Sequence, residues 1–121
     1  MKILEIDVIL GVRILLCIYI VLITTFALIP SPQTKSLFFL SDKIAHFLSF
    51  FILWMLVHRS FKNGLSLRFF SILMIYAFTL EILQSFTSTR SAEWGDILFD
   101  FLGLFVYFLI ARILSKRKSI K

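Results

Sequence analysis

Four long apolar stretches, separated by short polar segments, occupy most of this chain of 121 residues. A helix of about 20 apolar residues is long enough to cross the hydrocarbon core of a bilayer. Hydrophobic residues make up 60% of the chain, well above the roughly 45–50% of a soluble domain. The sequence therefore predicts an all-α, polytopic membrane protein with a single domain over residues 1–121. Its four transmembrane helices are predicted at about residues 8–29, 42–58, 67–86 and 96–114.

Local signals suggest where these helices begin and end. The first apolar stretch is longer than the roughly 7–15 residues of a signal-peptide core, and no small-residue cleavage site follows it, so we interpret it as a retained helix. Pro30 ends this helix, because proline disfavours helical backbone in the residue before it. Residues 31–40 are expected to form a loop, with Ser41 as the N-cap of the second helix. The basic tail from Ser115 to Lys121 is expected to fray.

Basic residues indicate the orientation of the chain. Ten of the 13 Lys and Arg residues fall on the side of the predicted bundle that holds both termini, and only Lys35, Lys43 and Arg90 fall on the other. Cytoplasmic loops carry the excess of basic residues, so both termini are expected in the cytoplasm. Because the basic residues lie at the ends of apolar stretches, we do not expect nucleic acid as a partner despite a net charge of +6.

Polar residues from three predicted helices reach a similar depth at the opposite, outer end. They are Asp42 and His46 in the second helix, Glu81 and Gln84 in the third, and Asp96 and Asp100 in the fourth. An ionisable residue at the centre of a span costs roughly 2.5–3.5 kcal/mol on insertion scales, so such groups pair with one another or line a wet cavity. Simpler roles stay open for single residues, such as helix-start charges for Asp42 and Asp96 or a helix cross-link for Gln84.

These side chains include the parts of a reaction centre. His46 could act as a general base or nucleophile, with Asp42 one turn before it to hold its tautomer and Glu81 as a general acid. Arg90 could grip a phosphate or carboxylate with its planar guanidinium. The predicted catalytic residues are His46, Asp42 and Glu81, and the predicted substrate-binding residues are Arg90, Gln84, Asp96 and Asp100. Asp96 and Asp100 could hold a divalent cation with Glu81, but no metal-binding motif supports this, so we assign no metal and no cofactor.

Four sequence motifs, in this order and spacing, resemble the VanZ-like family of membrane proteins. They are Asp42-Lys43-x-x-His46-Phe47-x-x-Phe50-Phe51, Glu81-x-x-Gln84, Arg90, and Asp96-Ile97-x-x-Asp100-x-x-Gly103. The resemblance implies a small multi-pass protein of the bacterial cytoplasmic membrane. The founding member is associated with low-level resistance to teicoplanin, a glycopeptide with a lipid tail, and the family has been grouped with membrane domains that act on lipid head groups or lipid-linked wall precursors. The chain departs from the family at Asp100, where asparagine is usual.

Two classes of function follow. The chain could be an enzyme, a hydrolase or transferase, that acts on the head group of a lipid or lipid-linked precursor at the outer leaflet. Alternatively, it could be a non-catalytic protein that binds or shields lipids or lipidated antibiotics. An ion conductor is disfavoured, because the inner halves of the predicted helices carry almost no polar residues apart from Arg13. Membrane lipids or lipid-linked precursors are thus the expected partners.

Overall fold

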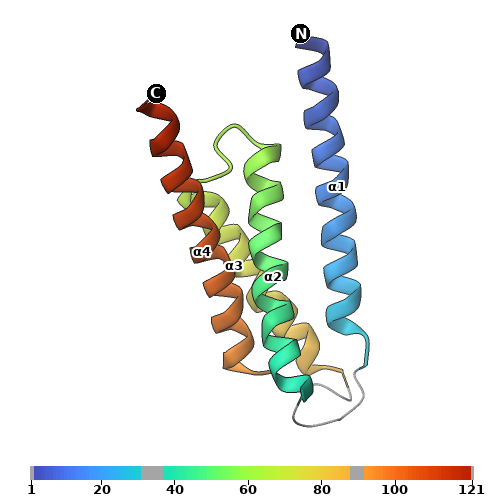
Figure 1. The fold of residues 1–121 in the computed structure, drawn as a ribbon. Coiled ribbons are helices and arrows are strands. Elements are labelled where there is room, and N and C mark those ends of the chain that lie inside the picture. The colour runs from blue at the N-terminus through green and yellow to red at the C-terminus, as the bar shows by residue number, and fades with distance from the viewer. Residues whose placement is uncertain (1, 31–36, 88–91, 121) are drawn as a thin grey trace.

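The chain forms a bundle of long helices. A computed structural model describes residues 2–30, 37–87 and 92–120, and these ranges hold the helices α1 (Lys2–Leu28), α2 (Leu37–Ser60), α3 (Leu67–Ser85) and α4 (Trp94–Ser119). Figure 1 shows that the N- and C-termini lie at one end of the bundle. The C-terminal ends of α1 and α3 and the N-terminal ends of α2 and α4 lie at the other. The predicted all-α fold is confirmed.

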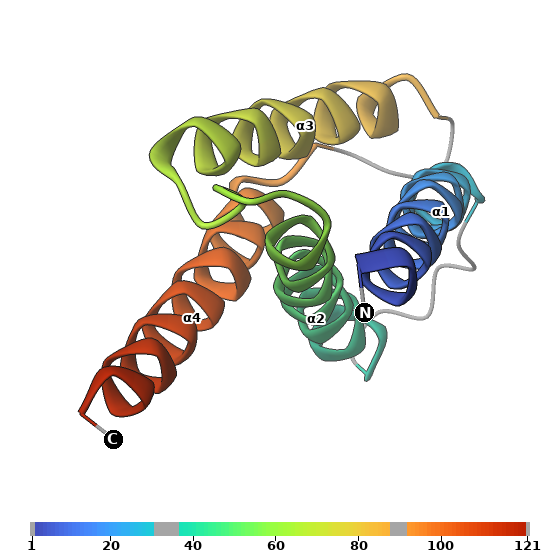
Figure 2. The same cartoon turned by 90° about the horizontal axis from the view of Figure 1, so that it is seen from above.

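Three of these helices, α1, α3 and α4, are long and apolar enough to cross a membrane. The surface of α1 is apolar along most of its length, and Leu16 is the residue of this helix that is buried against the core. Helix α2 has 24 residues and therefore spans about 36 Å at 1.5 Å per residue. It lies between α1 and α4, with α3 across one side of the bundle (Figure 2). This central place allows α2 to carry polar residues that its neighbours cover.

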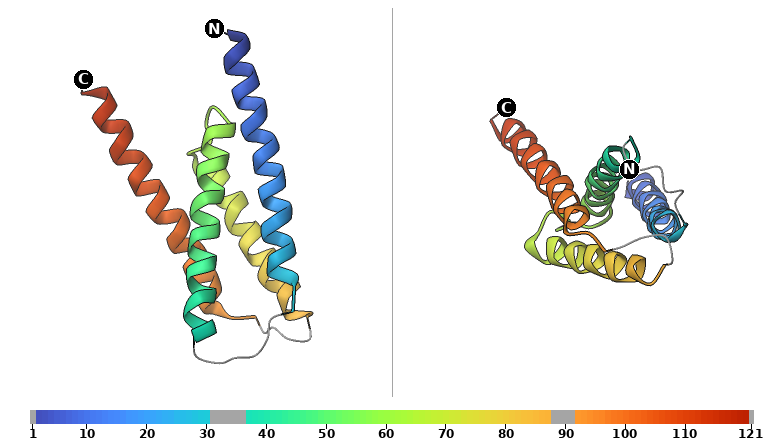
Figure 3. Two further views of the ribbon diagram at one scale, coloured as in Figure 1. Left: turned by 45° about the vertical axis from the view of Figure 1, so that its right-hand side comes forward. Right: turned by 90° about the horizontal axis from the view of Figure 1, so that it is seen from below.

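The core is centred on α2 and on the face that α4 presents to it. Leu53 and Leu104 are completely buried, and Trp54 packs between Phe70 of α3 and Phe108 of α4. The two helices approach closely at Gly103, where an added Cβ would collide with the Phe47 carbonyl oxygen. Small residues allow helix backbones to approach closely within membranes. Toward its C-terminus, α4 diverges from α2 (Figure 3).

A tight turn connects α2 to α3. The indole Nε1 of Trp54 donates a hydrogen bond of 2.9 Å to the Gly64 carbonyl. A Cβ on Gly64 would lie 2.5 Å from both the His58 Cα and the Val57 oxygen, so the turn requires glycine. Ser66 then caps α3, since its hydroxyl accepts a hydrogen bond of 3.5 Å from the Phe69 backbone N–H.

The helix ends differ from the prediction in several places. Helix α2 begins at Leu37 rather than Asp42, so the predicted N-cap, Ser41, lies inside it. Helix α1 begins at Lys2, and α4 runs from Trp94 to Ser119 through most of the basic tail that was expected to fray. The physical reason is that extending an existing helix adds one hydrogen bond for each residue fixed. These flanking residues include neither proline nor an interior glycine pair to stop the extension.

Candidate functional site

Lys43 of α2 forms a buried ion-pair network with the start of α4. Its side chain is only 3% exposed. The ammonium donates to Glu93 Oε2 at 2.7 Å and also to Asp96 Oδ1. Asp96 is itself buried, whereas the Glu93 side chain is half-exposed, at 46%. Desolvating an ammonium is costly, and the two carboxylates offset that cost.

His46, one turn along α2, lies between two carboxylates of α4. Its Nδ1 is 2.8 Å from Asp100 Oδ1, in hydrogen-bonding geometry. The Asp100 side chain is 2% exposed. The other ring nitrogen of His46, Nε2, is 3.7 Å from Asp96 Oδ2, which is too long for a hydrogen bond. In the neutral imidazole, a carboxylate acceptor at Nδ1 favours the tautomer with the proton on that nitrogen, which leaves a lone pair on Nε2.

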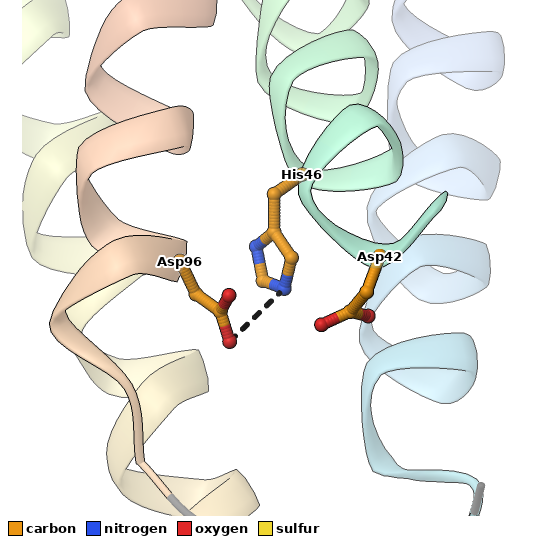
Figure 4. Close-up of side chains that lie close together, drawn as sticks. All are labelled: Asp42, His46 and Asp96. Carbon is orange, nitrogen blue, oxygen red and sulfur yellow. Dashed lines mark ion pairs between the residues drawn. The ribbon is translucent and has the colours of Figure 1, made fainter. Parts of the chain in front are cut away.

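Asp42, near the N-terminal end of α2, contributes a third side chain beside His46 and Asp96. Figure 4 shows the Nε2 edge of His46 directed between the carboxylates of Asp42 and Asp96. One ligand atom from each of these three residues lies within 4.8 Å of the other two. The trio therefore combines one imidazole nitrogen with two carboxylates in a space suited to a cation.

Two polar residues of α3 connect the site to its surroundings. A carboxylate oxygen of Glu81 accepts a hydrogen bond from the Glu93 backbone N–H, which fixes the entry to α4. The Gln84 amide donates a hydrogen bond of 3.0 Å to the Ala27 carbonyl of α1. Both side chains are buried. Glu81 thus anchors the residue that pairs with Lys43, and Gln84 links α3 to α1.

A groove of about 420 Å³ adjoins the cluster between α1, α2 and α3. Its polar lining includes Asp42, His46 and Gln84. Its apolar walls come from all three helices: Ile23, Phe26, Ala27, Ala45, Phe50 and Leu80. The groove therefore has a polar part and an apolar part, which suits an amphiphilic ligand.

The predicted site residues meet at one end of the bundle, but their partners differ from those expected. We predicted that Asp42 would hold the His46 tautomer, and this detail is wrong, because Asp100 contacts Nδ1. We assigned no metal from the sequence, and the three residues whose ligand atoms lie together are Asp42, His46 and Asp96, not the acids Glu81, Asp96 and Asp100 that were considered there. Arg90 lies outside the described residues, so its predicted role stays a prediction.

Lys43 was treated as an orientation signal in the sequence and was not assigned to the site. The sequence feature that could have assigned Lys43 to the site is its position between Asp42 and His46, at a depth where an unpaired ammonium has a high free-energy cost. Within the part of the chain that the structure describes, one ammonium and one imidazole accompany five carboxylates. These are Asp42, Glu81, Glu93, Asp96 and Asp100. The cluster therefore carries an excess of acidic groups.

Comparison with known proteins gives one match. The family model described as VanZ/LLP1 matches residues 16–115, which include every element of this site. No curated protein and no solved structure matches the chain.

Proposed function

The chain belongs to the VanZ/LLP1 family, and from this membership together with its polar cluster we propose that it acts on a lipid head group. The substrate class is a phosphate-bearing membrane lipid or a lipid-linked precursor of the cell wall. The reaction is hydrolysis or transfer of a phosphoester, in which an oxygen nucleophile forms a bond to phosphorus as a P–O ester bond breaks. The site operates at the outer face of the bacterial cytoplasmic membrane.

The shape and lining of the groove are the observation that carries this proposal. An amphiphile can place its head group beside His46 and Asp42 while its chain lies along Ile23, Phe26 and Leu80. The acyl chain of a membrane lipid is already out of water, so the apolar walls of the groove only have to match the lipid environment. The polar end then selects the ligand by its head group.

His46 is the reactive group in this proposal. Asp100 orients its ring through Nδ1, so the Nε2 lone pair faces the space beside Asp42 and Asp96 (Figure 4). An imidazole fixed in this way can accept a proton from a nucleophile or bind a cation that contacts the phosphate. Arg90 is proposed to grip the phosphate from the segment before α4.

The orientation rests on the distribution of charge. Basic residues are concentrated at the end of the bundle that carries both termini, so the positive-inside rule supports cytoplasmic termini and an outer-leaflet groove. A cysteine placed at Glu93 would test this. Glu93 is half-exposed, and a thiol there should react with an impermeant maleimide in intact cells.

The two histidines of α2 provide a matched test of the reaction. His46→Gln should abolish any change in the membrane lipid profile that expression of the parent protein causes. His58→Gln should preserve that change, because His58 lies at the other end of α2 and contacts Tyr107. The measurement is quantitative lipid mass spectrometry of matched strains with equal protein levels. If expression of the His46→Gln variant changes the lipid profile as much as expression of the parent does, a catalytic role for His46 is refuted.

A non-catalytic binding function is the second candidate. It is favoured by the structural contacts of Gln84 and Glu81, two predicted site residues whose hydrogen bonds hold α1 and the start of α4 in place. A binder that shields lipids or captures a lipidated antibiotic would keep its effect without proton chemistry. The test is teicoplanin sensitivity. If the parent and His46→Gln strains are equally sensitive, and both are less sensitive than an empty-vector strain, the non-catalytic alternative is selected.

A further inference from the structure

We propose that Asp42, His46 and Asp96 bind a divalent transition-metal ion at the polar end of the groove. The remaining coordination positions of this ion face the groove and take a phosphate oxygen of the head group. The second statement rests on the proposed function, whereas the first concerns this chain alone.

The geometry of the three side chains fits a cation better than direct contacts between them. Their ligand atoms lie within 4.8 Å of one another, and His46 Nε2 is 3.7 Å from Asp96 Oδ2. That separation is too long for a hydrogen bond. Two ligand atoms bound to one ion at 2.0–2.2 Å lie about 3.0–3.4 Å apart. Small rotations of the side chains would therefore bring all three atoms to bonding distance.

Two further contacts prepare these ligands. Asp100 holds His46 Nδ1 at 2.8 Å, which is the arrangement of a metal-binding histidine whose other nitrogen donates to a carboxylate. Lys43 contacts Oδ1 of Asp96, and the other oxygen, Oδ2, is the one directed at the histidine. His46 and Asp96 are thus each oriented by a buried neighbour before a cation binds.

The charge of the cluster supports the same conclusion. Five carboxylates surround one ammonium and one imidazole among the described residues. An anionic phosphate would be repelled by this excess of negative charge. A bound dication offsets two of these charges and offers positive charge to the phosphate. The cation therefore explains how an acidic site can take an anionic head group.

The ligand types favour particular metals. An imidazole nitrogen suits Zn²⁺ and other transition metals, while carboxylates suit Mn²⁺ and Mg²⁺. One nitrogen with two carboxylates thus points to Zn²⁺ or Mn²⁺ ahead of Mg²⁺ and Ca²⁺. Three protein ligands also leave at least one position open, as in catalytic zinc sites.

Metal binding is tested on the full chain in lipid-free detergent micelles, stripped with a chelator and titrated with Mn²⁺ or Zn²⁺. Electron paramagnetic resonance of Mn²⁺ and elemental analysis for Zn²⁺ should give about one ion per chain. Asp42→Asn and His46→Gln should each weaken binding by more than about 100-fold, because loss of a ligand must cost more than the about 10- to 100-fold loss that follows removal of an outer partner. Glu5→Gln, an exposed acid at the far end of α1, should bind as the parent does. The absence of saturable binding, or equal affinity in His46→Gln, would overturn the proposal.

A change of metal preference excludes misfolding as the explanation. His46→Cys replaces the imidazole with a soft thiolate and should bind Cd²⁺ more tightly than the parent while losing Mn²⁺. Asp100→Leu should lower affinity by about 10- to 100-fold, whereas Asp100→Asn keeps an acceptor for Nδ1 and should lower it less. Identical affinities in these two variants would contradict the orienting role of Asp100. Because these assays contain no substrate lipid, they can fail while the head-group function stands, and the reverse also holds.

Discussion

Gly103→Ala is the substitution that most directly tests how the two central helices meet. A Cβ at this position would collide with the Phe47 carbonyl oxygen, and it would lie 3.1 Å from both the Phe47 carbonyl carbon and the Phe51 nitrogen. All three atoms belong to the backbone of α2, so no side-chain rotation can relieve the contact. Helix α4 must instead move away from α2.

The size of the effect follows from the contacts. Carbon and oxygen atoms approach to about 3.3–3.6 Å, so α4 must shift by on the order of 1 Å. Overpacking of this kind costs about 1–3 kcal/mol, and backbone contacts place this site at the upper end. Alanine recovers about 1 kcal/mol through its helix propensity. The expected net loss in the free energy of unfolding is therefore about 2 kcal/mol.

The same shift should damage the polar cluster. Asp100 precedes Gly103 by three residues, about 4.5 Å along α4. A displacement of about 1 Å would stretch the contact between His46 Nδ1 and Asp100 Oδ1 from 2.8 Å beyond hydrogen-bonding distance. Metal affinity should therefore fall together with stability.

Equilibrium unfolding in mixed micelles of a mild detergent and dodecyl sulfate measures the stability change. Gly11→Ala is the matched control, because its added Cβ meets nothing within 4 Å. That variant should be unchanged or stabilised by up to about 1 kcal/mol. If both alanine variants unfold at the same detergent fraction, the close approach of α2 and α4 is refuted.

Two further predictions use the same unfolding assay. Lys43→Met should destabilise the fold by about 3–5 kcal/mol, because it leaves the buried carboxylate of Asp96, 6% exposed, without its ammonium. Adding Asp96→Leu should recover most of that loss, and a double variant no better than Lys43→Met would argue against the ion pair. Trp54→Phe should cost about 1 kcal/mol, because the Gly64 carbonyl loses its indole donor. An unchanged unfolding midpoint for Trp54→Phe would show that this turn is held by other contacts.

The sequence by itself determined the class of fold and the level of the polar site. Apolar length indicates which segments can cross a bilayer, and α1, α3 and α4 match the prediction of spanning helices, whereas α2, predicted as the fourth span, is not among the described helices apolar enough to cross. The cost of ionisable groups in hydrocarbon makes His46, Glu81 and Asp100 conspicuous, and their positions along each helix give a common depth. Depth depends only on the count of residues from a helix end, so it can be read from the sequence.

Only the tertiary structure decided which groups contact one another. Depth is one coordinate, while pairing also depends on how each helix is rotated and where it crosses its neighbour. The close approach at Gly103 brings α4 against α2, and this places Asp100 rather than Asp42 at Nδ1 of His46. Lys43 is buried for the same reason, since α2 occupies the centre of the bundle (Figure 2). Rotation and crossing are set by packing among all four helices, which no single segment of the sequence encodes.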